Sequence, residues 1–433
     1  MNFLRLISLL SICLFLQHSL YAQVKKPTRK KVISNTSVKC SAKVDSMELV
    51  KFNKALRGAE WSIPWNLIKP MSTWEGISVS KSGCVSEIVL SNNNLSGTIP
   101  VLNLPGLVQL LIEDKKVNGA IPSLTQLPNL KSLIIISPNI TGALPVLDKN
   151  TELELLNFDC PQLTGILPNF VKHLKLEELY LNGNFSGTIP EFTTLTRLES
   201  ISISGSKIIG NIPSFSFSPR MLDIKITNTS LNGSIPTFKS NLDLKSIDLS
   251  SNKLTGTIPT LNIHPKLEYI NLSNNQLTGL LPDLTDMDRL EEVLLEKNKL
   301  NGNLPIINLP KLRILKLGQN LLNGSIPDIQ GIPSIHVLDL SSNKFTGTLI
   351  DFNFLTNLEK FNLGGNSLIG EVPDFSHLPN LLDLYLNDNA FTGKVTDFSH
   401  LPNLVTLQIQ NNKFKGKAPK FKKCVNLRNL KTI

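Results

Sequence analysis

The stretch LKSIDLSSNKLTGTIP, residues 244–259, carries the pattern that decides the fold. Its apolar residues Ile247 and Leu249 alternate with polar ones, which is the two-residue period of a strand with one buried face. The stretch ends in a Gly-x-apolar-Pro tetrad that begins at Gly256. A single strand of this kind has nothing to bury its apolar face against, so the stretch predicts neighbours of the same design.

The tetrad recurs along most of the chain. It begins at Gly97, Gly119, Gly142, Gly165, Gly187, Gly210, Gly233, Gly256, Gly279, Gly302, Gly324, Gly370 and Gly416, with proline-free versions at Gly347 and Gly393. With the two proline-free versions included, these fifteen copies follow one another at intervals of 22 or 23 residues. Such units are leucine-rich repeats, and each turn of the chain is numbered here by the tetrad that ends it.

Successive turns of this kind stack at about 4.8 Å and merge their leucines into one core. We therefore predict an α/β repeat solenoid, mostly β, of about 15 turns of 22–23 residues. Its parallel sheet should line the concave face of an arc or superhelix. The outer arc that follows each tetrad is short and often contains a proline, which excludes a regular helix there.

Many turns have an asparagine five residues after their central apolar residue, as Asn252 follows Ile247. The same place holds Asn275, Asn298, Asn320, Asn343, Asn366, Asn389 and Asn412. There the chain turns inward, and an amide side chain can bond backbone groups that would otherwise lack partners. We therefore expect an asparagine ladder along the solenoid.

Composition agrees with one aliphatic core. Leucine makes up 75 of the 433 residues, and only 6% of the residues are aromatic. After residue 23 no apolar run reaches the length of about 18 residues that a membrane span needs. Residues 1–22 contain Arg5, then an apolar core and a cleavage site of small residues, which predicts a signal peptide. We expect a protein that is secreted or held in the cell envelope.

The rest of the chain divides into four segments. We predict a basic leader at 23–43, an N-terminal cap at 44–84, the solenoid at 85–419 and a C-terminal cap at 420–433. The N-terminal cap has an apolar-periodic stretch typical of a helix, and it carries Trp61, Trp65 and Trp74. These tryptophans should form the core of the cap, which covers the first turn.

Four cysteines follow the signal peptide, and export would permit their oxidation. Cys160 lies in the fourth turn and Cys424 beyond the fifteenth, so the stack should separate them by about 50 Å. Cys84 opens the first turn, about three turns from Cys160. Of the three possible pairings, only that of Cys40 with Cys84 is within reach, and we predict that Cys160 and Cys424 are free thiols.

The segments DSMELVKFNKALRGAEW and MSTWEGISVSKSGCVSEIVLSNNNLSGTIP, with the tetrads that follow, resemble the plant-type class of leucine-rich repeat ectodomains. The resemblance covers about residues 45–419 and extends to exported bacterial proteins with similar repeats. It implies extracellular binding, as in receptor-kinase ectodomains and in polygalacturonase-inhibitor-like proteins. The N-terminal caps of that class have a cysteine after their Trp-x-Gly motif, where this chain has Val79. The pairing of Cys40 with Cys84 therefore stays open.

Charge is distributed unevenly along the chain, whose net charge is +10. Residues 24–43 hold seven basic residues and residues 399–433 hold eight, and neither segment has an acid. Residues 44–398 hold 28 basic and 34 acidic residues. A mildly acidic body with basic ends is unlike the single basic stripe of a nucleic-acid reader, so no nucleic-acid partner is expected. The ends either attach to a polyanion or are solvated caps that resist aggregation.

Turns two to five differ from the others at the strand positions that face outward. Most turns present small or polar groups there, whereas these present an apolar centre with acidic residues around it. The residues that we predict to bind a ligand are Leu111, Glu113, Ile134, Ile136, Leu155, Asn157, Asp159 and Tyr180. The ladder asparagine is also missing here, because Lys115, Pro138 and Pro161 take its place. Two local rules that fail together are typical of a functional site.

Two other interpretations of this patch remain open. The repeats could have drifted without any ligand, or the basic leader 24–43 could cover the patch. If the patch is a ligand site, replacing both Ile134 and Ile136 with Asp should abolish ligand binding and leave the thermal midpoint of unfolding nearly unchanged.

Catalysis finds little support in the sequence. The histidines after the signal peptide are spread over distant turns: His173, His264, His336, His377 and His400. They are expected on the outer arc as repeat residues, and neither a triad nor a metal site nor a phosphate-binding loop is recognisable. We expect no catalytic residues, no cofactor and no metal.

The sequence therefore predicts an extracellular or cell-envelope recognition protein that binds a protein or peptide on its concave face. The alternative is a structural or adhesive surface protein that attaches to a polyanionic matrix, such as a glycan, through its basic ends. Inhibition of secreted hydrolases is a third possibility, with an enzyme as the partner. Salt separates the first two, because attachment to a polyanion weakens steeply with ionic strength and apolar binding does not.

Overall fold

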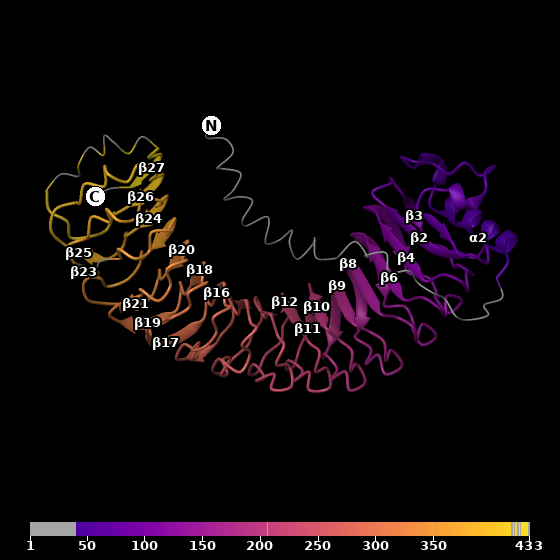
Figure 1. Cartoon of the computed structure of the whole chain (residues 1–433), viewed down its shortest axis with the longest axis horizontal. Coiled ribbons are helices and arrows are strands. Elements are labelled where there is room, and N and C mark those ends of the chain that lie inside the picture. The colour runs from indigo at the N-terminus through magenta and orange to yellow at the C-terminus, as the bar shows by residue number, and fades with distance from the viewer. Residues whose placement is uncertain are drawn as a thin grey trace. The chain divides into compact units, whose positions relative to one another are not determined.

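The computed structural model describes residues 40–205, 207–350, 352–416, 419, 421, 424 and 426–431. The predicted signal peptide and the predicted leader up to residue 39 lie outside this part of the chain. From Cys40 onward the chain forms one compact unit in which the turns stack in chain order (Figure 1). The unit is a mostly β solenoid of leucine-rich repeat turns, as the 22- or 23-residue period predicts.

The N-terminal cap consists of one α-helix, two short 3₁₀ helices and a strand. These are α2 (Ala42–Ala55), η1 (Gly58–Glu60), η2 (Met71–Thr73) and β1 (Ile77–Val79). The three tryptophans are buried, as predicted, and the rings of Trp65 and Trp74 stack with their centroids 5.0 Å apart. Strand β1 pairs antiparallel with the first strand of the solenoid, so the cap closes that edge of the sheet.

The main sheet receives one strand from each turn. In chain order these are β2 (Val85–Ser91), β4 (Gln109–Glu113), β6 (Ser132–Ile136), β8 (Leu155–Ile166), β9 (Glu178–Gly187), β10 (Ser200–Ser204), β12 (Asp223–Thr227), β13 (Ser246–Asp248), β14 (Tyr269–Asn271), β16 (Glu292–Leu294), β18 (Ile314–Lys316), β20 (Val337–Asp339), β22 (Lys360–Asn362), β24 (Asp383–Tyr385), β26 (Thr406–Gln408) and β27 (Asn429–Lys431). Neighbours pair in parallel, and equivalent residues of successive repeats lie opposite each other, as Ile247 lies opposite Ile270. These strands line the inner side of the stack (Figure 1).

Shorter strands follow around the tetrads. They are β3 (Ser96–Thr98), β5 (Lys116–Ala120), β7 (Asn139–Ala143), β11 (Lys207–Ile208), β15 (Thr278–Gly279), β17 (Lys299–Asn303), β19 (Leu321–Gly324), β21 (Lys344–Phe345), β23 (Ile369–Gly370) and β25 (Ala390–Phe391). In turns four and five this second segment is the continuation of β8 and β9 themselves. The tetrad glycines have a positive φ, for example 83° at Gly279, which L-residues with a side chain rarely adopt.

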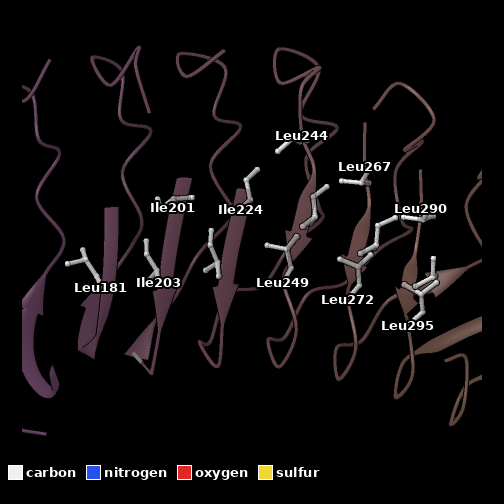
Figure 2. Close-up of a cluster of buried hydrophobic side chains, with 14 of the residues drawn as sticks. Leu181, Ile201, Ile203, Ile224, Leu244, Leu249, Leu267, Leu272, Leu290 and Leu295 are labelled. Carbon is white, nitrogen blue, oxygen red and sulfur yellow. The ribbon is translucent and has the colours of Figure 1, made fainter. Parts of the chain in front are cut away.

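The core is one continuous aliphatic cluster, as the leucine content predicts. Inward-facing residues repeat from turn to turn, so that Leu249, Leu272 and Leu295 belong to one spine (Figure 2). On the outer arc, phenylalanines add a second stack, in which the rings of Phe375 and Phe398 lie 6.1 Å apart. Because each turn buries its apolar side chains against the next one, the stability of the solenoid comes from contacts between neighbouring turns.

The asparagine ladder is present in turns eight to fifteen, as predicted. Asn298 is representative: its Nδ2 donates to the carbonyl oxygens of Leu272 (2.9 Å) and Leu295 (3.1 Å). Its Oδ1 accepts a hydrogen bond from the backbone N–H of Leu277 (3.0 Å). One side chain thus satisfies buried backbone groups of two successive turns.

The cysteines follow the geometric prediction. Cys40 and Cys84 form a disulfide, with 5.8 Å between their Cα atoms, which joins the start of α2 to the start of β2. This resolves the pairing that Val79 had left open. Cys160 and Cys424 are free and buried.

Within the described part of the chain, no helix combines the length and the apolar character that crossing a bilayer requires.

Candidate functional site

The main sheet is wider in its N-terminal half. Strands β2 to β12 pair with their neighbours over five residues, for example from Gln109 to Glu113, whereas β13 to β26 pair over three. The extra two residues add a third row of outward-facing side chains to the concave face. This widening creates the surface on which the predicted site residues lie.

In turns two to five the turn after the strand differs from that of turns eight to fifteen. In turns eight to fifteen a residue with positive φ, such as Ser251 at 57°, precedes the ladder asparagine and ends the strand. In turns two to five the chain has no such residue at 113–116, 136–139, 159–162 and 182–185; β8 and β9 continue through this point, whereas Lys115 and Pro138 each form a turn between two strands. Turns one and seven also pair over five residues, although Asn92 and Asn228 have a positive φ after the strand.

In turns two to four a polar residue four positions after the central apolar residue replaces the ladder asparagine. The Oδ2 of Asp114 accepts from the N–H of Leu95 (2.9 Å), and the Oγ of Ser137 donates to the carbonyl of Val117 (2.6 Å). The thiol of Cys160 makes the corresponding contact with the carbonyl of Ile135 (3.4 Å). The sequence prediction looked five residues on and found Lys115, Pro138 and Pro161. A spacing of four would have revealed these polar residues.

The strands β4, β6, β8 and β9 together present twelve side chains in three rows, which we call the grid. The first row is Gln109, Ser132, Leu155 and Glu178; the middle row is Leu111, Ile134, Asn157 and Tyr180; the third row is Glu113, Ile136, Asp159 and Asn182. The eight residues predicted to bind a ligand therefore all lie on this one surface. The predicted set did not include Gln109, Ser132, Glu178 and Asn182, which alternation along the strands would have added.

The apolar part of the grid is partly accessible. Leu133 and Ile135 point into the core, and Ile134 lies between them on the outward register. Only 2% of Ile134 is exposed, however, whereas Leu111, Ile136 and Leu155 are half-buried. The accessible apolar surface therefore consists of these three residues around a buried Ile134. An Asp at position 134 would bury a carboxylate and is unsuitable for testing binding.

Polar groups of the grid are mostly paired with one another. Tyr180 donates its hydroxyl to Glu178 (2.9 Å), and Asn182 donates its amide to Asp159 (2.7 Å). Burial, and then the charge of Glu178, raise the pKa of the Tyr180 hydroxyl, so it stays protonated and a donor. The amide nitrogen of Gln109 is buried and has no partner among the described residues. It is a donor that a carbonyl group of a ligand could satisfy.

His173 and His264 lie on the outer arc, where the sequence predicts the histidines, and each bonds backbone carbonyl groups there. His264 is buried and its two ring nitrogens lie 3.2 Å from the carbonyl oxygens of Asn241 and Thr237. The Nε2 of His173 lies 3.2 Å from the carbonyl of Leu147 in the same way. Burial lowers the pKa of both side chains. Among the residues that the structure describes, no group of three His, Cys, Asp or Glu side chains could hold a metal ion.

Comparison with known proteins supports the same fold. Residues 243–261 and 266–286 match the family model named Leucine Rich Repeat. No curated protein is similar to the chain in sequence.

Solved structures resemble the chain over most of its length. The plant peptide hormone receptor RGFR1, in complex with RGF2, superposes with a TM-score of 0.77 and 26% identity, over 83% of this chain and 60% of that chain. The ectodomain of the receptor kinase GASSHO1/SCHENGEN3 of Arabidopsis thaliana, in complex with CASPARIAN STRIP INTEGRITY FACTOR 2, has a TM-score of 0.77 and 25% identity, over 88% and 52%.

A leucine-rich repeat protein of Leptospira interrogans shares the fold, with a TM-score of 0.60 and 23% identity, over 74% of this chain and 81% of that chain. The chain spans only 60% and 52% of the lengths of the two plant receptor domains. The period, the asparagine ladder and these likenesses identify the fold as a leucine-rich repeat solenoid, which resembles those of plant receptor-kinase ectodomains and of bacterial leucine-rich repeat proteins.

Proposed function

We propose that this protein is an extracellular or cell-envelope recognition protein that binds a peptide or protein ligand through the grid on its concave face. The observation that carries the proposal is the accessible apolar centre of Leu111, Ile136 and Leu155 with Glu113 and Asp159 beside it. A solvent-facing apolar cluster with a polar rim is the arrangement of a binding hot spot.

Two further features support the proposal. The grid lies on the widest part of the sheet, where an extended segment finds the largest flat surface. The buried Gln109 amide lacks an acceptor among the described residues, and main-chain carbonyls of a peptide supply acceptors. Two of the similar plant structures are receptors in complex with their ligands, and the resemblance extends that role to this chain as a proposal.

The test replaces the accessible apolar residues. We expect Ile136→Asp with Leu155→Asp to abolish capture of the ligand. Two carboxylates would then stand where the ligand makes its apolar contact, and the surfaces would no longer be complementary. The control is Gln408→Asp, which adds a charge to the middle row of β26, far along the stack. Affinity capture from extracellular extracts, followed by titration of the purified captured component, measures the effect.

The proposal fails if the double variant and the control bind the captured component equally well. Circular dichroism and thermal melting of each variant exclude loss of the fold as the cause. A saturable turnover in a screen of hydrolase substrates would point to an enzyme instead, which the described residues give no reason to expect.

The basic C-terminal end favours the second candidate, attachment to a polyanionic matrix. Lys394 and Lys415 lie opposite each other in a parallel bridge, and both side chains are exposed, as are Lys413, Arg428 and Lys431. Binding to heparin beads that is lost between low and high salt would support this candidate. Binding through the grid should survive the same change in salt, since it is mainly apolar.

A further inference from the structure

A second cluster on the concave face lies outside the grid, in turns nine to twelve. Strands β14, β16, β18 and β20 place Tyr269, Glu292, Ile314 and Val337 side by side in the first row. Leu294 lies in the middle row beside them. Tyr269, Leu294, Ile314 and Val337 are half-buried and form what we call the collar around Glu292.

Glu292 is largely buried in this collar, and its carboxylate has no partner among the described residues. Only 9% of the residue is exposed, and among the described residues no hydrogen bond and no ion pair within 4.0 Å reaches its carboxylate. Asp248 lies two turns earlier, in the middle row of β13, and is buried to a similar degree. It accepts hydrogen bonds from the backbone N–H and the hydroxyl of Ser250 (3.1 and 2.7 Å). The carboxylate of Glu292 is therefore open to a partner from solution, and a charged donor would bind it more strongly than water does.

Charged groups of both signs surround the collar, since Lys316 lies opposite Leu294 in the middle row. Glu296, in the same turn as Glu292, has a buried Oε2 that also lacks a partner among the described residues. Burial raises the pKa of Glu292 and of Glu296, and Arg313 and Lys316 act on Glu292 only as charges at a distance. The pKa of Tyr269 is raised by its burial and by the charges of Asp248, Glu292 and Glu296. Neither Arg313 nor Lys316 is paired with Glu292, so its carboxylate is the group at this point that a cation of a ligand would bind.

We infer that Glu292 and its collar form a binding site for a lysine or arginine side chain of a peptide or protein partner. The carboxylate would accept the charged hydrogen bonds of the cation, while Leu294, Ile314 and Val337 cover its aliphatic stem. Tyr269 supplies an aromatic ring beside the charge. The molecule already contains such a contact, because Lys360 Nζ lies 5.4 Å from the centre of the Tyr385 ring on the same face. This site does not depend on the grid, and either can exist without the other.

The test uses small probes and a separate signal for each site. N-acetyl-arginine amide is titrated into the full chain with labelled Ile, Leu and Val methyl groups, and N-acetyl-citrulline amide is its neutral counterpart. We expect saturable shifts of the Leu294, Ile314 and Val337 methyl resonances with the arginine probe. The affinity for the citrulline probe should be at least tenfold weaker. Methyl groups of Ile136 and Leu155 report on the grid and should stay unshifted.

The variant Glu292→Gln keeps the shape of the side chain and removes its charge. It should bind the arginine probe at least tenfold more weakly, while the core methyl of Leu267 keeps its position and the thermal midpoint does not fall. The matched control is Asp383→Asn, in the first row of β24. Equal binding of the two probes, equal binding by the variant, or shifts confined to the grid would overturn the inference. A fall in the midpoint of Glu292→Gln would also overturn it, because it would show that the carboxylate already has a stabilising partner.

Discussion

The wide turns two to five and the narrow turns eight to fifteen have nearly the same repeat length but differ in their concave surface. In the narrow turns a left-handed residue and an asparagine end the strand after three paired residues. In the wide turns a polar side chain one position earlier, such as Ser137, takes over part of the bonding, and the strand continues for five. In these two regions the longer paired strand goes with a bonding side chain one position earlier in the turn, and the longer strand offers one more row of concave surface.

The largest expected effect separates the two kinds of turn by their stability. Asn298→Ala should lower the free energy of unfolding by about 3 kcal/mol, because buried backbone groups of neighbouring turns lose their partners. Ser137→Ala removes one hydrogen bond and should cost about 1 kcal/mol. Denaturant titration measures both, with hydrogen exchange to locate the weakened turns. Equal losses would mean that the two turns are held with the same strength.

A smaller effect should be common to both regions, because their outer arcs are alike. His173 lies in turn five, which is wide, and His264 lies in turn nine, which is narrow. Burial lowers the pKa of both side chains. Below the ordinary value of 6.5 the unfolded chain takes up a proton that the folded chain refuses, so stability is present above that pH and is lost as the pH falls.

His173→Gln and His264→Gln should each reduce this loss on acidification to the same extent. Thermal midpoints between pH 7.5 and 5 measure it, and His377→Gln, at an exposed place on the arc, is the control. A response in only one of the two variants would show that the regions also differ on their convex side.

The smallest effect concerns ion pairs between turns. Lys131 Nζ lies 2.9 Å from Glu154 in the wide region, and Lys266 Nζ lies 2.5 Å from Asp243 in the narrow one. All four side chains are at least one-third exposed, so Lys131→Ala and Lys266→Ala should each change the free energy of unfolding by less than about 0.5 kcal/mol. A loss above 1 kcal/mol by denaturant titration would give surface charge a part in holding the wide turns together.

Sequence reasoning located the outward positions of the grid but misjudged some of their surroundings. Alternation along the strand correctly placed Ile134 away from the core, yet its burial depends on side chains of the turns on either side. The loss of the ladder asparagine at Lys115, Pro138 and Pro161 was recognised. Its replacement by Asp114, Ser137 and Cys160 was not, because the prediction assumed one spacing for every turn. Glu292 drew no attention because a single acid on a polar face is ordinary in sequence.

The sequence by itself determined the solenoid, the direction in which each strand residue points, the tryptophan core of the cap and the separation of Cys160 from Cys424. These follow from the repeat period, which recurs along the sequence, and from the alternation of apolar and polar residues within each repeat. Only the tertiary structure decided the width of the sheet, the burial of Ile134 and the missing partner of Glu292. Those properties belong to side chains 22 or 23 residues apart that stacking brings into contact, and no local pattern records how closely they pack.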